Sequence, residues 1–303
     1  MMKPGKLPPK LLQQLLDKIS FAEPSVLLGP KIGEDAAILN TTSSKYLVVT
    51  TDPITFATDK IGWYVVNINA NDIAVMGGDP KWLLITLLLP QTINKKTIDD
   101  IFSQIIDTST NLGITLVGGH TEITPNIISP IAIGTLIGEV SKNHVVRTQD
   151  AKPKDAIILT KKIALEGTSI IAREFSKKLK SLGIGNDSIQ KAKKFISYPG
   201  ISVIKEANIA RDFKYVHSMH DPTEGGLSTA LIELAIASNT GIMIDAKKIK
   251  IAPESKQICK VLNINPMGLL SSGCLIITIP QKHSSELIKI FENHNIESYE
   301  IGH

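Results

Sequence analysis

Apolar runs alternate with short polar, glycine-containing stretches along the whole chain, and their spacing predicts a mixture of strands and helices. The first half holds eight such segments. Helical spacing of leucines or a 3.6-residue apolar period predicts helices at PPKLLQQLLDKIS, KIGWYVVNINANDIAVMGG and TIDDIFSQIIDTSTNLG. Continuous apolar runs predict strands at AAIL, YLVVTT (ending at Asp52), KWLLITLLLP, ITLVGGH and IISPIAIGTLIGEV.

The second half begins a strand, loop and helix pattern again near residue 150. AKPKDAIILTKKIALEGTSIIAREF carries this pattern, and Pro153 is a natural place for a boundary. Further strands are predicted at YVHSMH and CLIITIP, and a last helix at HSSELIKIFENHN. We therefore expect a mixed α/β (α+β) protein of two domains, residues 1–150 and 151–303.

The stretch HDPTEGGL, residues 220–227, directly precedes the apolar run STALIELAIAS. Asp221 is a good helix cap, Pro222 suits a first helical position, and Glu224 follows the cap by three residues, as in a capping box. The stretch therefore predicts a helix start at Asp221. Gly225 and Gly226 would also let backbone N–H groups approach a phosphate closely.

Composition narrows the class of protein. The chain has 303 residues, 43% of them hydrophobic, and its longest apolar run, WLLITLLL, is too short to cross a bilayer. The N-terminus lacks the apolar core of a signal peptide, and the two cysteines, Cys259 and Cys274, make no disulfide framework. A net charge of +4 with only three arginines argues against nucleic-acid binding. We expect a cytoplasmic protein without a nucleic-acid or membrane partner.

Four acidic segments, GEDAA, TTD, NAND and HDPTEGG, each follow or interrupt an apolar run. Carboxylates at strand ends beside glycines suit Mg²⁺ carrying a polyphosphate, since Mg²⁺ takes one or two carboxylates with phosphate oxygens and water. Each Asp alone also suits a turn or a cap, and Gly118-Gly119 a tight turn. No G-x-x-x-x-G-K-[ST] motif is present. The residues by themselves leave both readings open.

The order of these segments resembles one superfamily of ATP-binding enzymes. The matching pieces, in chain order, are GEDAAIL, TTDPIT, VNINANDIAVMGGDP, VGGHTEIT, KDAIILTKKIALEGTSI, HDPTEGGLSTALIELA and INPMGLLSSGCLIITIP. They resemble aminoimidazole ribonucleotide (AIR) synthetase, selenophosphate synthetase, thiamine-monophosphate kinase and the hydrogenase maturation protein HypE. The sequences of these motifs are most similar to those of HypE and of AIR synthase-related proteins.

This resemblance implies a PurM-like fold, in which the N-terminal domain forms a β-barrel across a homodimer interface and an α+β domain follows. It also implies ATP and Mg²⁺ as cofactors. By position in the motifs, the resemblance implies that Mg²⁺ is bound by Asp35, Asp52, Asp72 and Asp221. It implies that the nucleotide or the acceptor is bound by Asn71, Gly118, Gly119, Gly225 and Gly226. His120, Glu122 and Glu224 are the candidate catalytic residues.

The chain departs from each named relative. Selenophosphate synthetase has a reactive Cys or selenocysteine near its N-terminus, whereas Cys259 is the first cysteine here. Thiamine-monophosphate kinase has an acid where His120 stands and a GEDYE-like stretch where this chain reads SSGCLI. HypE carries a C-terminal tail ending in cysteine, whereas this sequence ends ESYEIGH, and it commonly has an acid at His120 and a base at Glu224.

The sequence leaves one favoured function and two alternatives. The favoured one is an ATP- and Mg²⁺-dependent enzyme that transfers a phosphoryl group to an amide or similar oxygen of an unidentified acceptor. One alternative is a non-catalytic, ATP-binding assembly partner of HypE-like origin, and the other is a small-molecule kinase like thiamine-monophosphate kinase.

Overall fold

The computed structural model describes residues 8–19, 23–41, 43–55 and 59–303. Its contacts divide the chain into two compact units. One, here called the N-terminal unit, consists of Glu23–Gly29 and Ala36–Val145; the other, the C-terminal unit, takes the described part of the first 22 residues, Pro30–Asp35 and Val146–His303. None of the helices in the described residues has the length and apolar character that crossing a membrane requires.

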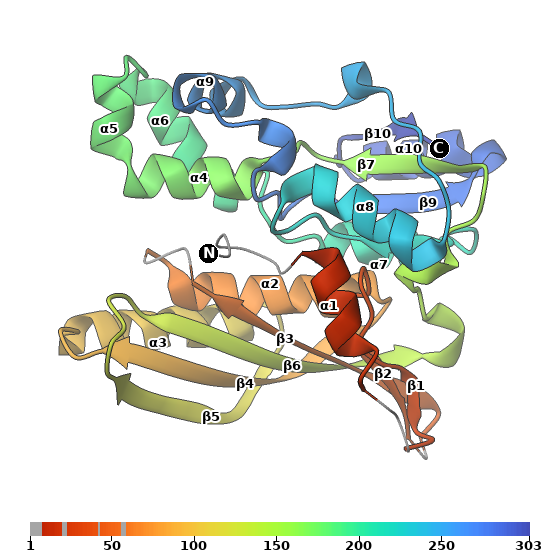
Figure 1. Ribbon diagram of the computed structural model, residues 1–303, viewed down its shortest axis with the longest axis horizontal. Coiled ribbons are helices and arrows are strands. Elements are labelled where there is room, and N and C mark those ends of the chain that lie inside the picture. Colours follow the sequence, from red (N-terminus) through yellow and green to blue (C-terminus); the bar gives the residue numbers. More distant parts are fainter. Residues whose placement is uncertain (1–7, 20–22, 42, 56–58) are drawn as a thin grey trace. The chain divides into compact units, whose positions relative to one another are not determined.

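The N-terminal unit is built on a six-stranded sheet in the order β1-β2-β3-β6-β4-β5 (Figure 1). β4 and β5 are parallel and the other neighbours antiparallel. The strands are β1 (Val26–Leu28), β2 (Ala37–Asn40), β3 (Lys45–Ile54), β4 (Asp79–Pro90), β5 (Thr115–Thr124) and β6 (Ile131–Ser141). The strand predicted to end at Asp52 runs on to Ile54, because Asp52, Pro53 and Ile54 continue to pair with β6.

Two helices, α2 (Ile61–Val75) and α3 (Lys95–Asn111), lie on the same face of this sheet (Figure 1). Every residue of α2 except Trp63 is buried, so its apolar period does not mark a solvent face. α3 is amphipathic, and the Asn94 side chain caps its start by accepting from the Thr97 N–H. Phe102 on this helix is 37% exposed.

The opposite face of the sheet carries no helix of its own unit (Figure 1). Side chains at alternate positions point to that face, as the two-residue period of a strand requires. Many are large and apolar, and they are half-buried or exposed: Leu47 and Val49 of β3, Trp82, Leu84 and Leu88 of β4, and Ile133 and Ile137 of β6. The edge strand β5 is exposed at every residue but its last.

The C-terminal unit holds an antiparallel four-stranded sheet in the order β10-β7-β9-β8. Its strands are β7 (Asp155–Thr160), β8 (Ser218–His220), β9 (Ile276–Pro280) and β10 (Ser298–Gly302). Its helices are α1 (Pro9–Leu16), α4 (Leu165–Glu174), α5 (Ser176–Ser181), α6 (Asn186–Lys193), α7 (Ile204–Asp212), α8 (Gly226–Ser238), α9 (Pro253–Leu262) and α10 (Ser284–Asn293).

Every residue of β7 is buried, which fits a central strand with covered faces. Ile157 and Leu159 pack with Leu227 and Leu234 of α8 in one core cluster. A second cluster contains no strand residue and joins α4, α5, α6 and α9. The predicted mixed α/β architecture is therefore confirmed.

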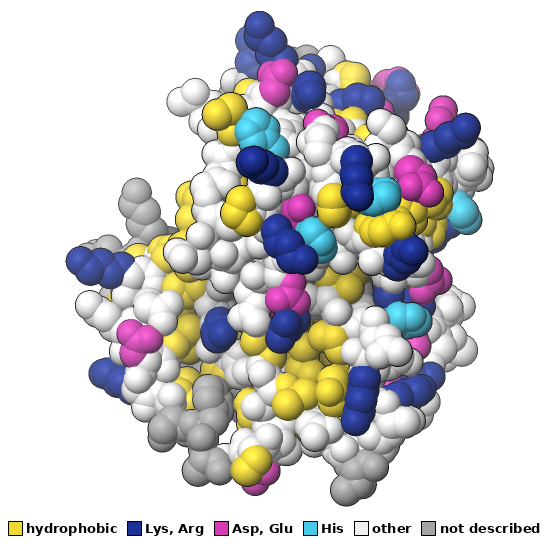
Figure 2. All heavy atoms as spheres, turned by 90° about the vertical axis from the view of Figure 1, so that its right-hand side faces the viewer, with side chains coloured by type: hydrophobic (Ala, Val, Ile, Leu, Met, Phe, Trp, Pro, Cys, Tyr) yellow, Lys and Arg dark blue, Asp and Glu magenta, His cyan; other side chains and the backbone are white. Residues whose placement is uncertain are grey.

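On the face drawn in Figure 2, lysines and arginines lie among acids and histidines, so this face carries mixed charge.

The helix predicted to have Asp221 as its cap begins four residues later, so the capping-box interpretation was wrong. Gly225 is the N-cap of α8, and no side chain caps the helix. Gly226 has a φ of +62°, and a Cβ there would lie 2.5 Å from the Leu269 carbonyl oxygen. The short 3₁₀ turn η5 (Pro266–Gly268) thus packs against the bare backbone of Gly226, and a side chain would prevent that approach.

Candidate functional site

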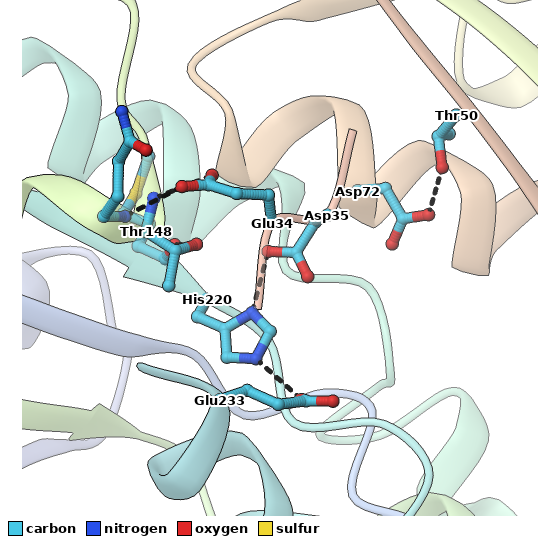
Figure 3. Close-up of polar contacts among 9 residues, drawn as sticks. Glu34, Asp35, Thr50, Asp72, Thr148, His220 and Glu233 are labelled. Atoms are coloured by element: carbon cyan, nitrogen blue, oxygen red, sulfur yellow. Dashed lines mark hydrogen bonds and ion pairs between the residues drawn. The ribbon is translucent and has the colours of Figure 1, made fainter. Parts of the chain in front are cut away.

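A buried polar contact joins β3 to α2 in the N-terminal unit. Thr50 donates its hydroxyl to Asp72 Oδ2 at 2.7 Å, and both residues are buried (Figure 3). A carboxylate out of water is costly unless it is hydrogen-bonded, and this contact supplies part of that compensation. Asp72 therefore has a fixed position on the helix.

Asn69 holds the neighbouring stretch of the same strand. Its Oδ1 accepts from the Asp52 N–H at 3.0 Å, and its Nδ2 donates to the Asp52 carbonyl at 3.3 Å. Asp52 pairs with Gly134 on β6, where a Cβ would lie 2.4 Å from the Asn69 amide nitrogen. A glycine at 134 is therefore what allows Asn69 to reach the backbone of Asp52.

These contacts place two predicted metal ligands at one seam. Thr50 and Asp52 are two residues apart on β3 and share a strand face, whereas Asn69 and Asp72 are three apart and share a helix face. We call Thr50, Asp52, Asn69 and Asp72 the β3–α2 seam. Asn71, a predicted nucleotide ligand, is on the same helix and is fully buried.

Asp35, the third predicted metal ligand, belongs to the C-terminal unit and is bound to a histidine. His220 Nδ1 lies 2.8 Å from Asp35 Oδ2, and His220 Nε2 lies 3.2 Å from Glu233 Oε2 (Figure 3). Burial alone would lower the pKa of His220, but the two carboxylates outweigh it and raise that pKa to about 10. At neutral pH this is a buried imidazolium between two carboxylates.

The segment that carries Asp35 is fixed at two further points. Glu34 accepts hydrogen bonds from the N–H groups of Thr148 and Gln149 (Figure 3). A Cβ on Gly33 would lie 2.5 Å from the Glu233 carbonyl oxygen, so the segment runs directly against α8. Burial raises the pKa of Glu34 to about 7, against the opposing effect of those backbone donors. A cavity of about 290 Å³ borders Glu34, Asp35, His220 and Glu233.

The remaining residues of HDPTEGGL lie in the stretch from β8 to α8. Asp221 is 1% exposed. Burial of the Cys274 thiol raises its pKa, and the negative charge of Asp221 raises it further. Its carboxylate therefore faces the interior of the C-terminal unit. Glu224 is half-buried, and Gly225 and Gly226 form the start of α8 described above.

Gly118, Gly119, His120 and Glu122 lie within the edge strand β5, which confirms the strand predicted at ITLVGGH; the tight turn that was the other reading of the two glycines is absent. His120 Nε2 is 3.2 Å from Glu122 Oε2, and Thr124 donates to Glu122 Oε1. The Thr124 bond and then the His120 bond lower the pKa of the exposed Glu122. Beside this strand is a cavity of about 430 Å³, lined by α3, β4 and residues 116–121.

Among the described residues, no three His, Cys, Asp or Glu side chains form a ready metal cluster. Mg²⁺ does not need one, because it commonly takes one or two carboxylates and completes its shell with phosphate oxygens and water. The β3–α2 seam fits this requirement, with Asp52 and Asp72 held close to one strand face. Asp35 fits less well, because the His220 imidazolium already neutralises it.

Family models match both halves of the chain. Residues 33–140 match the N-terminal domain, and residues 152–303 the C-terminal domain, of AIR synthase related protein. The chain belongs to the AIR synthase-related family. This places the seam and β5 in the N-terminal family domain, and HDPTEGGL in the C-terminal one.

Several named relatives are similar to this AIR synthase-related chain. A Methanocaldococcus jannaschii protein named for hydrogenase expression and formation is 27% identical over 300 residues, 96% of this chain and 84% of the relative. Thiamine-monophosphate kinase of Pyrococcus horikoshii is 30% identical over 83% of this chain and 78% of its own. Carbamoyl dehydratase HypE of Rhizobium leguminosarum bv. viciae is 23% identical over 85% and 73%.

Solved structures share the fold. HypE in a HypE–HypF complex superposes with a TM-score of 0.77 at 18% identity, covering 96% of this chain and 92% of the other. HypE in complex with ATP gives a TM-score of 0.67 at 20% identity, covering 96% and 85%. The PurM-like fold expected from the sequence, close to HypE, is thereby confirmed.

Sequence reasoning missed four side chains that hold the predicted site residues: Thr50, Asn69, Glu233 and His220 in its bridging role. Two had a usable signal. Thr50 is two residues before Asp52 and Asn69 three before Asp72, so the strand and helix periods already placed each of them on the same face as a predicted metal ligand. Glu233 had none, because nothing local links position 233 to position 35.

We predict that Gly134→Ala weakens Mg-ATP binding more than Gly138→Ala does. Both glycines lie on β6 beneath α2, and a Cβ at either would be 2.4 Å from an α2 side chain, Asn69 or Ile73. Both variants should lose stability, by about 1–3 kcal/mol. Only the first displaces the side chain that holds Asp52. Calorimetric titration should show at least a fivefold larger Kd for Gly134→Ala than for Gly138→Ala; equal values would contradict this role of Asn69.

His220→Gln should destabilise the C-terminal unit by about 3–5 kcal/mol at pH 6, because it leaves two buried carboxylates without their cation. The folded pKa of His220, about 10, exceeds its ordinary value of 6.5. The stabilisation is therefore complete below pH 6.5 and is lost as pH rises through about 10. Urea unfolding of the wild type and the variant at pH 6 and at pH 10 measures this difference in stability, with the exposed change His294→Gln as the control. A difference from the wild type that stays constant up to pH 10 would contradict a charged His220.

Proposed function

We propose that this protein is an ATP- and Mg²⁺-dependent phosphoryl-transfer enzyme of the HypE and AIR synthase-related type. The observation that carries the proposal is the β3–α2 seam, in which Thr50 holds the carboxylate of Asp72 and Asn69 holds the backbone of Asp52, both within the N-terminal family domain. ATP in a HypE structure of the same fold supports the nucleotide. Most of the catalytic effect in phosphoryl transfer comes from positioning and charge stabilisation, which such a seam can supply.

In this proposal Asp52 and Asp72 hold the metal ion, which would neutralise charge on the transferred phosphoryl group. Asn71 and the Gly118-Gly119 stretch serve the nucleotide or the acceptor. His120 and Glu122, which lie 3.2 Å apart on an exposed strand, are suited to orient an acceptor oxygen and take its proton. In the C-terminal unit, Asp35, Asp221, Glu224, Gly225 and Gly226 are proposed as metal- or substrate-binding residues, and His220 holds Asp35 in position.

The acceptor is proposed as an amide or similar oxygen, by analogy with the carbamoyl dehydratase relatives. A second candidate is a small-molecule kinase, favoured by the 30% identity to a thiamine-monophosphate kinase over 83% of this chain. The two differ in their products. The first releases phosphate after activating the oxygen, whereas the second leaves a stable phosphorylated product.

We also propose that the protein is a homodimer in the cytoplasm. The uncovered face of the six-stranded sheet, with its half-buried apolar side chains and the exposed strand β5, supports a second copy of this chain as its cover. Apolar patches of this kind on a soluble chain usually mark an interface.

Mg-ATP should raise the melting temperature of the wild type, because a ligand that binds only the native state stabilises it. Asp52→Asn and Asp72→Asn should each abolish most of that increase, since each removes one charge from the proposed metal site. Differential scanning fluorimetry with and without Mg-ATP gives the shift within each variant, which corrects for altered intrinsic stability. Asp99→Asn, an exposed change on α3, is the control. An undiminished shift in both seam variants would rule out the magnesium assignment.

Sedimentation should show a particle of twice the 32.9 kDa chain mass. Ile133→Asp places a charge in the middle of the uncovered face and should shift the population to monomer. Ile128→Asp makes the same change at a position that is 97% exposed and should leave the dimer intact. A wild type that is monomeric at micromolar concentration would contradict the proposed dimer.

A further inference from the structure

A third cavity, of about 410 Å³, lies at the end of β7 in the C-terminal unit. Three segments distant in sequence line it: residues 161–162 after β7, residues 198–206 leading into α7, and residues 295–297 before β10. None of them belongs to the β3–α2 seam, to β5 or to HDPTEGGL. The proposed function therefore assigns no role to this cavity.

One wall of the cavity contains a buried ion pair. Lys161 Nζ lies 2.7 Å from Glu206 Oε1 and also donates to the Ser202 carbonyl at 2.7 Å. The side chains of Lys161 and Glu206 are 10% and 3% exposed. Buried ion pairs seldom stabilise a fold more than apolar side chains of similar size would. This pair is therefore better explained by a need for fixed charge at the cavity than by stability.

The backbone at Lys161 is also unusual. Its φ is +53°, in the left-handed region that a side chain disfavours. The Lys161 N–H donates to the Glu297 carbonyl at 2.7 Å, which holds the chain in that conformation. Strained backbone of this kind concentrates at functional sites. Two independent features, the strain and the buried ammonium, thus meet at one residue of the cavity.

Two more lysines stand at the cavity. Lys162 Nζ is 3.7 Å from Glu297, and Lys205 Nζ donates one hydrogen bond to the His294 carbonyl. Lys250 approaches Glu297 more closely, at 3.0 Å. The charged residues that line the cavity, lysines 161, 162 and 205 and glutamates 206 and 297, carry three positive and two negative charges, a net charge of +1. Lys250 lies outside this lining and offsets the charge of Glu297, so the cavity favours an anion.

We propose that this cavity binds a small phosphate monoester, with its phosphate between the ammonium groups of Lys162 and Lys205. An ammonium group keeps donors available after one contact and is a common partner for phosphate. Lys161, fixed by Glu206, adds positive charge from the wall. The cavity is larger than a phosphate group needs, so an organic group fits beside Tyr198 and Pro199. The site is independent of the proposed phosphoryl transfer.

The test uses ribose 5-phosphate as the probe, with ribose and inorganic phosphate as reference ligands, in calorimetric titrations of the full-length protein. Lys162→Gln/Lys205→Gln should raise the Kd for ribose 5-phosphate at least tenfold. Lys256→Gln/Lys289→Gln removes the same charge from exposed helix positions and should change the Kd less than twofold. Ribose should not bind, and inorganic phosphate should bind more weakly than the ester. Asp52→Asn should leave binding of the ester unchanged.

Four results would overturn the proposal: no ester binding by the wild type, an unchanged Kd in the cavity variant, an equal loss in the control variant, or a loss in Asp52→Asn. The last result would place the ester at the proposed nucleotide site. Thermal unfolding without ligand checks that both double variants fold. If the cavity variant does not, the single change Lys205→Gln, at an exposed position, replaces it with an expected loss of at least threefold.

Discussion

Helix α2 is bound to its sheet by polar side chains as well as by apolar packing, and the proposed chemistry depends on that polar contact. Thr50 holds the carboxylate of Asp72, and Asn69 holds the backbone of Asp52 from both sides. Glycines 134 and 138 on β6 let the helix lie close enough for these bonds to form. Core packing and the placement of the acidic residues are therefore one constraint, because moving the helix outward would separate the Asp72 carboxylate from Thr50 and the Asp52 backbone from Asn69.

The C-terminal unit positions its acidic residue by another method. Asp35 lies far from His220 and Glu233 in sequence, and the buried imidazolium joins them. The charge is buried, at a free-energy cost that the two carboxylates offset. Glu34 and Gly33 fix the same segment to backbone groups at 148–149 and on α8. In consequence Asp35 is already neutralised, which separates its role from that of Asp52 and Asp72.

Periodicity predicted the long elements and missed what depends on distant partners. α3 and β4 followed their patterns, because one face of each is buried. Short β10 carries too weak a pattern for detection and forms by pairing with β7. The capping box at Asp221 failed because Gly226 must lie against residues 267–269, which moves the helix start. Motif order identified the family and its fold, whereas the supports of Asp35 and Asp72 required the tertiary structure.

The central claim, transfer of the γ-phosphoryl group of ATP, is tested most directly by following Mg-ATP by ³¹P nuclear magnetic resonance in the presence of the protein and a panel of amide, carbamoyl and alcohol acceptors. The account predicts ADP with either phosphate or a new phosphorylated acceptor, at a rate that depends on one acceptor and falls at least a hundredfold in Asp72→Asn. AMP with pyrophosphate would contradict it, as would bound ATP that stays intact with every acceptor.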